Sequence, residues 1–150
     1  MKRIFPVLLI LLVSVSVIAA AGSVEVGLKA NTDLDIATFT NFYFNDNFSL
    51  GASLASEIQT SSNTLSLKHA QVSGKYHVPS IRRNLSLFGG GGLRMGLGGS
   101  SNQISSVFIF GIRINSSYGL NLIGEVNLVS PISNLSDYKL EPWFGLGFRF

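Results

Sequence analysis

Few side chains in this chain could do covalent or metal chemistry. The 150 residues include two His and no Cys, which excludes a disulfide scaffold and any Cys-ligated metal site. A nucleophilic mechanism needs a hydroxyl beside a His base, and His69 with Ser73 or His77 with Ser80 offers that spacing. Ser is so frequent here that such pairs arise by chance. We therefore predict no catalytic residue, no metal site and no cofactor.

The glycine run at 89–92 is a second candidate for chemistry. A phosphate-binding loop would continue with Lys-Ser or Lys-Thr and open a helix, whereas an alternating strand pattern follows here. The run is more typical of a strand that bends or lets bulky neighbours approach closely. We expect no nucleotide site in this segment.

The charge balance argues against nucleic acid as a partner. The formal net charge is +3, but Lys2 and Arg3 account for two of the basic residues. Without them 9 basic residues face 8 acidic ones, and no Lys/Arg-rich stripe is present to follow a phosphate backbone. We predict no nucleic-acid binding.

The N-terminal segment has the pattern of a secretory signal peptide. Lys2 and Arg3 precede an apolar run at 7–13, and small residues follow at Ala19–Ala21. An uncleaved helical anchor is the alternative, since the weakly apolar stretch reaches about the length of a membrane span. The Ala-x-Ala spacing favours cleavage, so we predict a signal peptide at 1–21 and a single mature domain at 22–150.

The mature domain alternates apolar and polar residues with a period of two, which is typical of strands. The fourth predicted strand changes phase near Lys68 and His69, which indicates a β-bulge. A strand of about 11 residues, tilted near 45°, rises ~26 Å and matches the apolar band of an outer-membrane barrel. We expect strands at about 24–30, 34–44, 48–58, 64–78, 85–97, 104–115, 118–128 and 138–150, with 79–83 as a connection. An even number of strands joined by short turns predicts an up-and-down antiparallel barrel.

The composition of the non-apolar face indicates which face is inside. Charged residues make up 13% of the chain, against roughly a quarter in soluble domains. The non-apolar face is mostly Gly, Ser and Asn with few charges, which is thin for a water-facing surface but suits a narrow lumen in which charges pair. We therefore predict an all-β, eight-stranded antiparallel transmembrane β-barrel with a polar interior. A secreted, soluble lipocalin-like barrel that binds an apolar ligand is the alternative.

This orientation assigns residues to the lumen and to the lipid. Glu125 and Glu141 are expected to pair with Arg94, Arg113 or Arg149. Lys75 and Lys139 share the inward phase. The predicted lumen charge network is Glu25, Lys29, Glu57, Arg94, Arg113, Glu125, Glu141 and Arg149, and the predicted lipid-facing residues are Phe108, Phe110, Leu120, Leu122 and Phe144.

The C-terminal residues resemble a known recognition signal. Gly145, Phe148 and Phe150 follow the order Gly, two spacers, hydrophobe, spacer and terminal aromatic, which resembles the signal read by the outer-membrane insertion machinery. Phe144 departs from it, since a polar residue usually precedes the Gly. At the level of pattern the whole of 22–150 resembles the small eight-stranded outer-membrane barrels of bacteria, of the OmpA and OmpX type.

The resemblance implies an orientation and a set of partners. Both ends of the domain would lie in the periplasm with the turns at 45–47, 79–83 and 116–117, and the loops at 60–63, 99–103 and 130–137 would face outward. The implied location is the bacterial outer membrane. The implied contacts are outer-membrane lipid, lipopolysaccharide and the insertion machinery, and the implied state is a monomer.

A lumen bounded by eight strands is only wide enough for side chains. We therefore predict a non-enzymatic envelope protein with a structural or surface-interaction role and a plugged lumen. A lipid A esterase is a further alternative, because some barrels of this kind are lipid A deacylases that use His, Ser and an acidic residue. Neither His–Ser pair in this chain has the His-x-Ser order of those enzymes.

Overall fold

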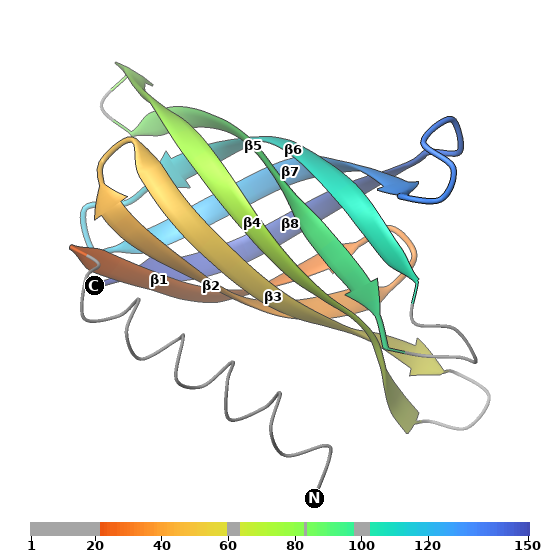
Figure 1. The fold of residues 1–150 in the computed structure, drawn as a ribbon. Helices are drawn as coiled ribbons and strands as arrows, with labels where there is room; N and C mark the ends of the chain where they lie inside the picture. The colour runs from red at the N-terminus through yellow and green to blue at the C-terminus, as the bar shows by residue number, and fades with distance from the viewer. Residues whose placement is uncertain (1–21, 60–63, 83, 98–102) are drawn as a thin grey trace, which may run out of the picture.

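A computed structural model describes residues 22–59, 64–82, 84–97 and 103–150 (Figure 1). The predicted signal peptide at 1–21 lies outside the described residues, as do the loop at 60–63 and most of the loop at 99–103. The described residues contain no helix that is long and apolar enough to cross a membrane.

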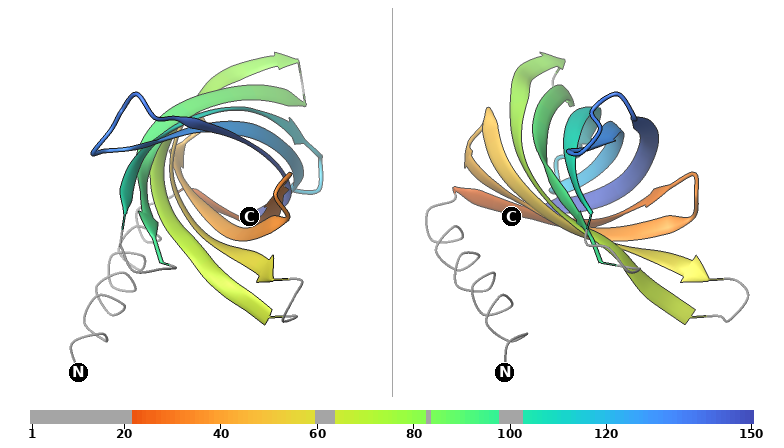
Figure 2. Two further views of the ribbon diagram at one scale, coloured as in Figure 1. Left: turned by 90° about the vertical axis from the view of Figure 1, so that its right-hand side faces the viewer. Right: turned by 45° about the vertical axis from the view of Figure 1, so that its right-hand side comes forward.

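Eight antiparallel strands close into one barrel, as predicted. Each strand pairs with the next along the chain, and β1 pairs with β8 to complete the ring. The view along the barrel in Figure 2 shows this closure. The strands are β1 (Ser23–Asn31), β2 (Asp35–Asn45), β3 (Phe48–Gln59), β4 (Thr64–Arg82), β5 (Leu85–Gly96), β6 (Ile104–Asn115), β7 (Leu120–Pro131) and β8 (Lys139–Arg149).

Strand β4 contains the predicted bulge and is longer than predicted. His69 lies opposite Ala55 and Leu67 lies opposite Ser56, so Lys68 is the extra residue. The segment 79–82 is not a connection, because β4 continues to Arg82, which pairs with Leu85. The register between β4 and β5 shifts between Val78 and Arg82, and such a shift accommodates a proline within a ladder.

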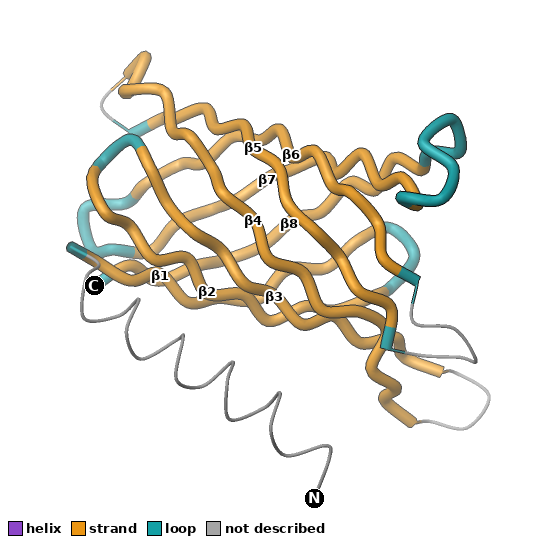
Figure 3. The backbone as a smooth tube through the Cα atoms, viewed as in Figure 1, coloured by secondary structure: helices purple, strands orange, loops and turns teal. Residues whose placement is uncertain are grey.

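The connections divide the barrel into two ends (Figures 1 and 3). The terminal end holds the start of β1, the end of β8 and the turns after β2 and β6. The distal end holds the turn after β1 and the loop after β7. The turn at 32–34 is a distal connection that the sequence analysis did not assign.

Strand β7 begins at Leu120, two residues later than predicted. The reason is the turn before it, in which Ser116 N–H donates to Leu120 O at 2.8 Å and Gly119 has a φ of 83°.

The outward face of the barrel is a continuous apolar surface. Large hydrophobic side chains are exposed on every strand, among them Leu28, Ile36, Leu54, Val72, Leu93, Phe110, Leu122 and Phe144. The charged side chains of Glu25, Arg113 and Glu125 are buried inside. An apolar surface of this extent is unsuited to water and suits the hydrocarbon of a bilayer. The molecule is a transmembrane barrel, and the lipocalin-like alternative is wrong because the apolar face does not enclose a ligand.

Glycines on the inward face make room for aromatic rings in the lumen. A Cβ on Gly111 would overlap the Phe88 ring, and a Cβ on Gly27 would come within 2.5 Å of the Phe39 ring. In the 89–92 run, a Cβ on Gly92 would come within 2.8 Å of the Ser73 Cα, so β5 lies close against β4. Phe39 and Phe88 pack with Val107, Ile109 and Ile123 in a buried apolar cluster within the lumen.

Candidate functional site: a polar network inside the barrel

Glu25 is the centre of a polar cluster near the terminal end. Its side chain is fully buried and accepts hydrogen bonds from Asn41 Nδ2 at 2.9 Å, Tyr43 Oη at 2.8 Å and Asn121 Nδ2 at 2.6 Å. Asn41 and Tyr43 lie on β2, which pairs with β1. Asn121 lies on β7, which is separated from β1 by β8. A buried carboxylate is costly unless it is hydrogen-bonded and paired, and three donors meet the first condition.

Arg113 supplies the charge that pairs with Glu25. Its Nη1 lies 3.6 Å from Glu25 Oε2 and donates a hydrogen bond to the Tyr43 hydroxyl, which in turn donates to Glu25. The guanidinium carbon lies 5.0 Å from the centre of the Tyr43 ring, and that of Arg149 lies 4.0 Å from it. Tyr43 is therefore the link between two arginines and the buried carboxylate.

Glu125 is held by two lysines. Lys29 Nζ pairs with Glu125 Oε1, and Lys75 Nζ lies 3.7 Å from Oε2. Lys75 also donates to Asn41 Oδ1 at 3.3 Å, and Asn127 Nδ2 donates to Glu125 at 3.4 Å. The shared partner Asn41 joins the Glu125 group to the Glu25 group. We call the set Glu25, Lys29, Lys75, Arg113 and Glu125 the inner cluster.

A second set of charges lies toward the distal end. Lys68 Nζ donates to Asp35 at 2.7 Å, and Arg94 Nη1 donates to Glu141 at 2.8 Å. We call Asp35, Lys68, Arg94 and Glu141 the distal cluster. Asn31 Nδ2 donates to Asp35 at 2.8 Å, and Arg94 Nη2 donates to Gln71 at 3.1 Å.

Trp143 lies between the two clusters. It packs with Ala37 and Ala55. The centre of its ring lies 5.1 Å from Nζ of Lys29, a member of the inner cluster, and the ring centres of Trp143 and His69 are 6.3 Å apart. Its exposure is 1%. Trp143 is therefore a buried apolar contact beside the inner cluster.

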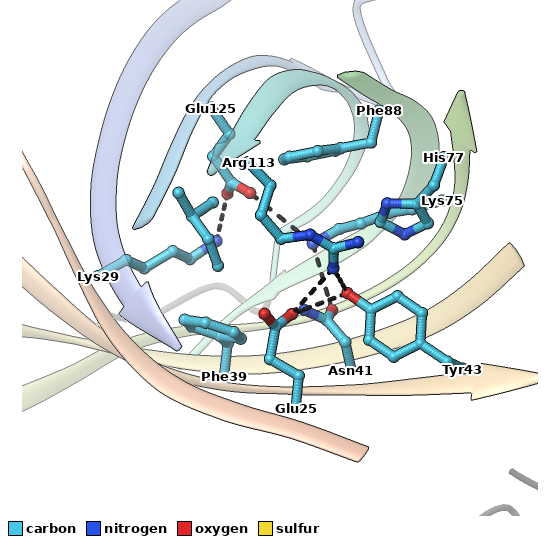
Figure 4. A pocket seen from close by; sticks show the side chains of 11 residues that line it. Glu25, Lys29, Phe39, Asn41, Tyr43, Lys75, His77, Phe88, Arg113 and Glu125 are labelled. Carbon is cyan, nitrogen blue, oxygen red and sulfur yellow. Dashed lines mark hydrogen bonds and ion pairs between the residues drawn. The ribbon is translucent and has the colours of Figure 1, made fainter. Parts of the chain in front are cut away.

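The inner cluster surrounds an internal cavity of about 10 Å³. Figure 4 shows side chains from β1, β2, β4, β5, β6 and β7 converging on it. About this volume is the lower limit for one water molecule. Some buried atoms facing the lumen have no hydrogen-bond partner among the described residues, namely His77 Nδ1, Ser86 Oγ, Arg113 Nε, Asn127 Oδ1 and Trp143 Nε1.

The structure places most of the predicted lumen charges inside. Glu25, Lys29, Arg94, Arg113, Glu125 and Glu141 are buried. Glu57 is a correction: it has the inward phase, but it is exposed near the distal end of β3 and forms no ion pair with a described residue, because β3 and β4 extend past the closed part of the barrel. Arg149 lies at the terminal rim, partly exposed, where Ser23 Oγ is 2.8 Å away and Asp46 3.7 Å away.

The pairing differs from the one expected. Glu141 pairs with Arg94, as expected, but Glu125 pairs with lysines and with no arginine. Arg113 reaches Glu25 instead. Strand period assigns a side chain to the lumen but does not say which strands it reaches across the lumen. The sequence analysis also missed Tyr43 and Asp35; Tyr43 shares the period-two phase of Asn41, and that signal could have placed it inside.

The His and Ser side chains of the His–Ser pairs that the structure describes are buried in the lumen. His69 and Ser73 are both buried in the lumen, and His77 Nε2 lies 2.8 Å from Ser49 Oγ, a partner the sequence analysis did not consider. The side chain of Ser80 lies outside the described residues.

The predicted lipid-facing residues lie on the outer surface. Phe108, Phe110, Leu120, Leu122 and Phe144 are exposed there. In the C-terminal motif, Phe148 and Phe150 also point outward with ring centres 6.2 Å apart, while a Cβ on Gly145 would lie 2.7 Å from the Lys29 Cβ. Gly145 thus gives the Lys29 side chain its path into the lumen.

Comparison with solved structures identifies the fold. The N-terminal β-barrel domain of Pseudomonas aeruginosa OprF matches with a TM-score of 0.66 and 12% identity, covering 85% of this chain and 96% of that one. The chain has the fold of small outer-membrane barrels. The outer-membrane barrel Ail of Yersinia pestis, solved in a phospholipid bilayer nanodisc, matches with a TM-score of 0.53 and 15% identity over 85% of this chain and 97% of that one.

A designed transmembrane β-barrel also matches, with a TM-score of 0.60 and 17% identity over 85% of this chain and 93% of that one. No protein-family model and no curated protein sequence matches the chain. The likeness to these structures is therefore one of fold.

Proposed function

We propose that this protein is a non-enzymatic barrel of the bacterial outer membrane, with a structural or surface-interaction role and a lumen plugged by its own side chains. The observation that carries the proposal is the inverted polarity of the molecule. An apolar outer surface surrounds an interior in which buried carboxylates are hydrogen-bonded and paired with cations.

The packing of the inner cluster supports the plugged lumen. The cavity there, about 10 Å³, is too small for a hydrated ion, so we propose that no continuous path crosses the barrel. Opening one would require ion pairs such as Lys29–Glu125 to separate inside the barrel. Breaking a buried pair costs about 3–5 kcal/mol, so the closed arrangement dominates.

The absence of enzymatic activity is part of the proposal. The His and Ser side chains that lie together, His77 and Ser49, are buried in the lumen. A lipid in the surrounding membrane contacts the outward face instead and does not reach them. Hydrolysis of an acyl ester needs the nucleophile within reach of the substrate carbonyl.

Residence in the membrane involves lipid and the insertion machinery. The outward surface contacts outer-membrane lipid, and lipopolysaccharide would meet its distal half. We propose that the predicted signal peptide at 1–21 directs export and that Gly145, Phe148 and Phe150 serve as the insertion signal. A closed barrel has no free strand edge for another copy to pair with, which supports a monomer.

Planar-bilayer recording tests the plugged lumen. Purified barrel from the outer-membrane fraction, checked for heat-modifiable migration on a detergent gel, is added to the bilayer. We expect no steady conductance from single barrels. A steady, large conductance from monomers would overturn the plugged lumen, and recovery of the protein in the aqueous fraction would overturn membrane residence.

A further inference from the structure

The inner cluster holds more positive than negative charge. Glu25 and Glu125 are its two carboxylates, and Lys29, Lys75 and Arg113 are its three cations, so the sum over these described residues is +1. All five are buried. In the distal cluster, by contrast, Asp35 and Glu141 match Lys68 and Arg94. An unbalanced charge in a low-dielectric lumen is costly.

Two buried nitrogen atoms beside the same cavity lack partners among the described residues. They are Arg113 Nε and His77 Nδ1, and their side chains are 4% and 3% exposed. Figure 4 shows the His77 ring beside the Arg113 guanidinium, with Lys75 adjacent. If Ser49 donates its hydroxyl proton to His77 Nε2, the ring proton resides on Nδ1. Both unpartnered atoms are then donors that require an acceptor.

The size of the cavity limits the acceptor to a small species. A volume of about 10 Å³ corresponds to about one water-sized sphere. A phosphate or sulfate does not fit, and the excess of positive charge disfavours a metal cation. A water molecule would satisfy the donors but leave the charge unbalanced. A halide would satisfy the donors and also balance the charge.

We propose that the lumen binds one small monovalent anion, of the size of chloride, between Arg113, Lys75 and His77. The anion accepts from the two unpartnered donors and neutralises the third cation of the inner cluster. This inference concerns the lumen alone and does not depend on the role of the protein in the envelope.

Chloride-dependent stability tests the proposal. The folded barrel in detergent micelles is unfolded in urea while chloride replaces gluconate at constant sodium concentration. Above the dissociation constant, each tenfold increase in chloride should lower the unfolded-to-folded ratio tenfold, because the ligand binds only the folded state. Lys75→Met removes the excess cation and should abolish this dependence. The matched control Lys68→Met lies in the distal cluster and should keep the wild-type dependence.

Crystals of the wild-type barrel grown in bromide give a direct measurement. We expect an anomalous difference peak in the cavity beside Arg113. Because this measurement uses the wild-type barrel, it decides the proposal even if Lys75→Met fails to fold. Density with no anomalous signal would mean a water molecule only and would overturn the proposal. A chloride dependence that persists unchanged in Lys75→Met would overturn it as well.

Discussion

Glu125 illustrates how a single side chain is made stable inside the barrel. Its carboxylate is buried, and Lys29, Lys75 and Asn127 reach it from other positions on the barrel wall. Each partner is itself buried. The loss of Glu125, Lys29 or Lys75 therefore leaves a buried charge that has lost a partner, where water does not reach it.

Glu125→Leu should destabilise the barrel strongly. Lys29 loses its carboxylate partner and Lys75 keeps Asn41 alone, so we expect the free energy of unfolding to fall by about 3–5 kcal/mol. Urea unfolding in detergent, followed by heat-modifiable migration, measures it. Asp46→Asn is the control, since it removes a carboxylate from an exposed pair with Arg149 and should cost about 0–1 kcal/mol. Equal losses in the two variants would contradict the account.

Asp33 in the distal turn should titrate below the ordinary range. Lys139 Nζ donates to it at 2.7 Å, which lowers the pKa of the Asp33 carboxyl. A lowered pKa in the folded state means that the pair stabilises the fold above the unfolded pKa of about 3.9 and that this contribution is lost as pH falls through the lower, folded value. NMR titration of the Asp33 carboxyl carbon measures it. Lys139→Gln should raise the pKa, and an unchanged pKa would count against the pair.

At the scale of the element, the strands depend on inward glycines that accept rings from their neighbours. Gly111 on β6 lies beneath Phe88 of β5, and Gly27 on β1 lies beneath Phe39 of β2. These contacts let adjacent strands keep their register while the lumen fills with aromatic side chains. A larger residue would push either the ring or the backbone from its place.

Gly111→Val should destabilise the barrel. Its Cβ would overlap the Phe88 ring and come within 2.6 Å of the Gly124 carbonyl oxygen, and overpacking of this kind costs about 1–3 kcal/mol. Gly74→Val is the matched control: its Cβ would lie 3.7 Å from the Phe48 ring, an ordinary contact. Urea midpoints compare the two variants. A control that is as unstable as Gly111→Val would show that strand glycine in general, and not the ring contact, is responsible.

The strands were largely predictable from the sequence because period two assigns each residue to one face. The phase change near Lys68 predicted the bulge for the same reason. The extension of β4 to Arg82 was not predictable, because Pro79 is a signal for a connection and the register shift that accommodates it depends on β5. In the lumen, Tyr43 was obscured by aromatic residues on both faces of its strand. The pairing of Glu125 with Lys29 joins β7 to β1 and depends on barrel closure.

The whole molecule is a cylinder with its polarity inverted relative to a soluble protein. Exposed apolar side chains such as Phe110 and Leu122 drive its insertion, and buried charges such as Glu25 and Arg113 hold its interior together. Both features arise from one alternation in the sequence. The central claim is therefore that the apolar side of the strands faces lipid.

Site-directed spin labelling tests that claim most directly, and the absence of Cys from the chain makes single labels straightforward. With the barrel in lipid bilayers, labels at Phe110 and Leu122 should collide with oxygen and not with a water-soluble nickel chelate. A label at Tyr118, exposed in the terminal turn, should collide with the chelate. Access of the chelate to Phe110 and Leu122 would place the apolar face in water and contradict the account.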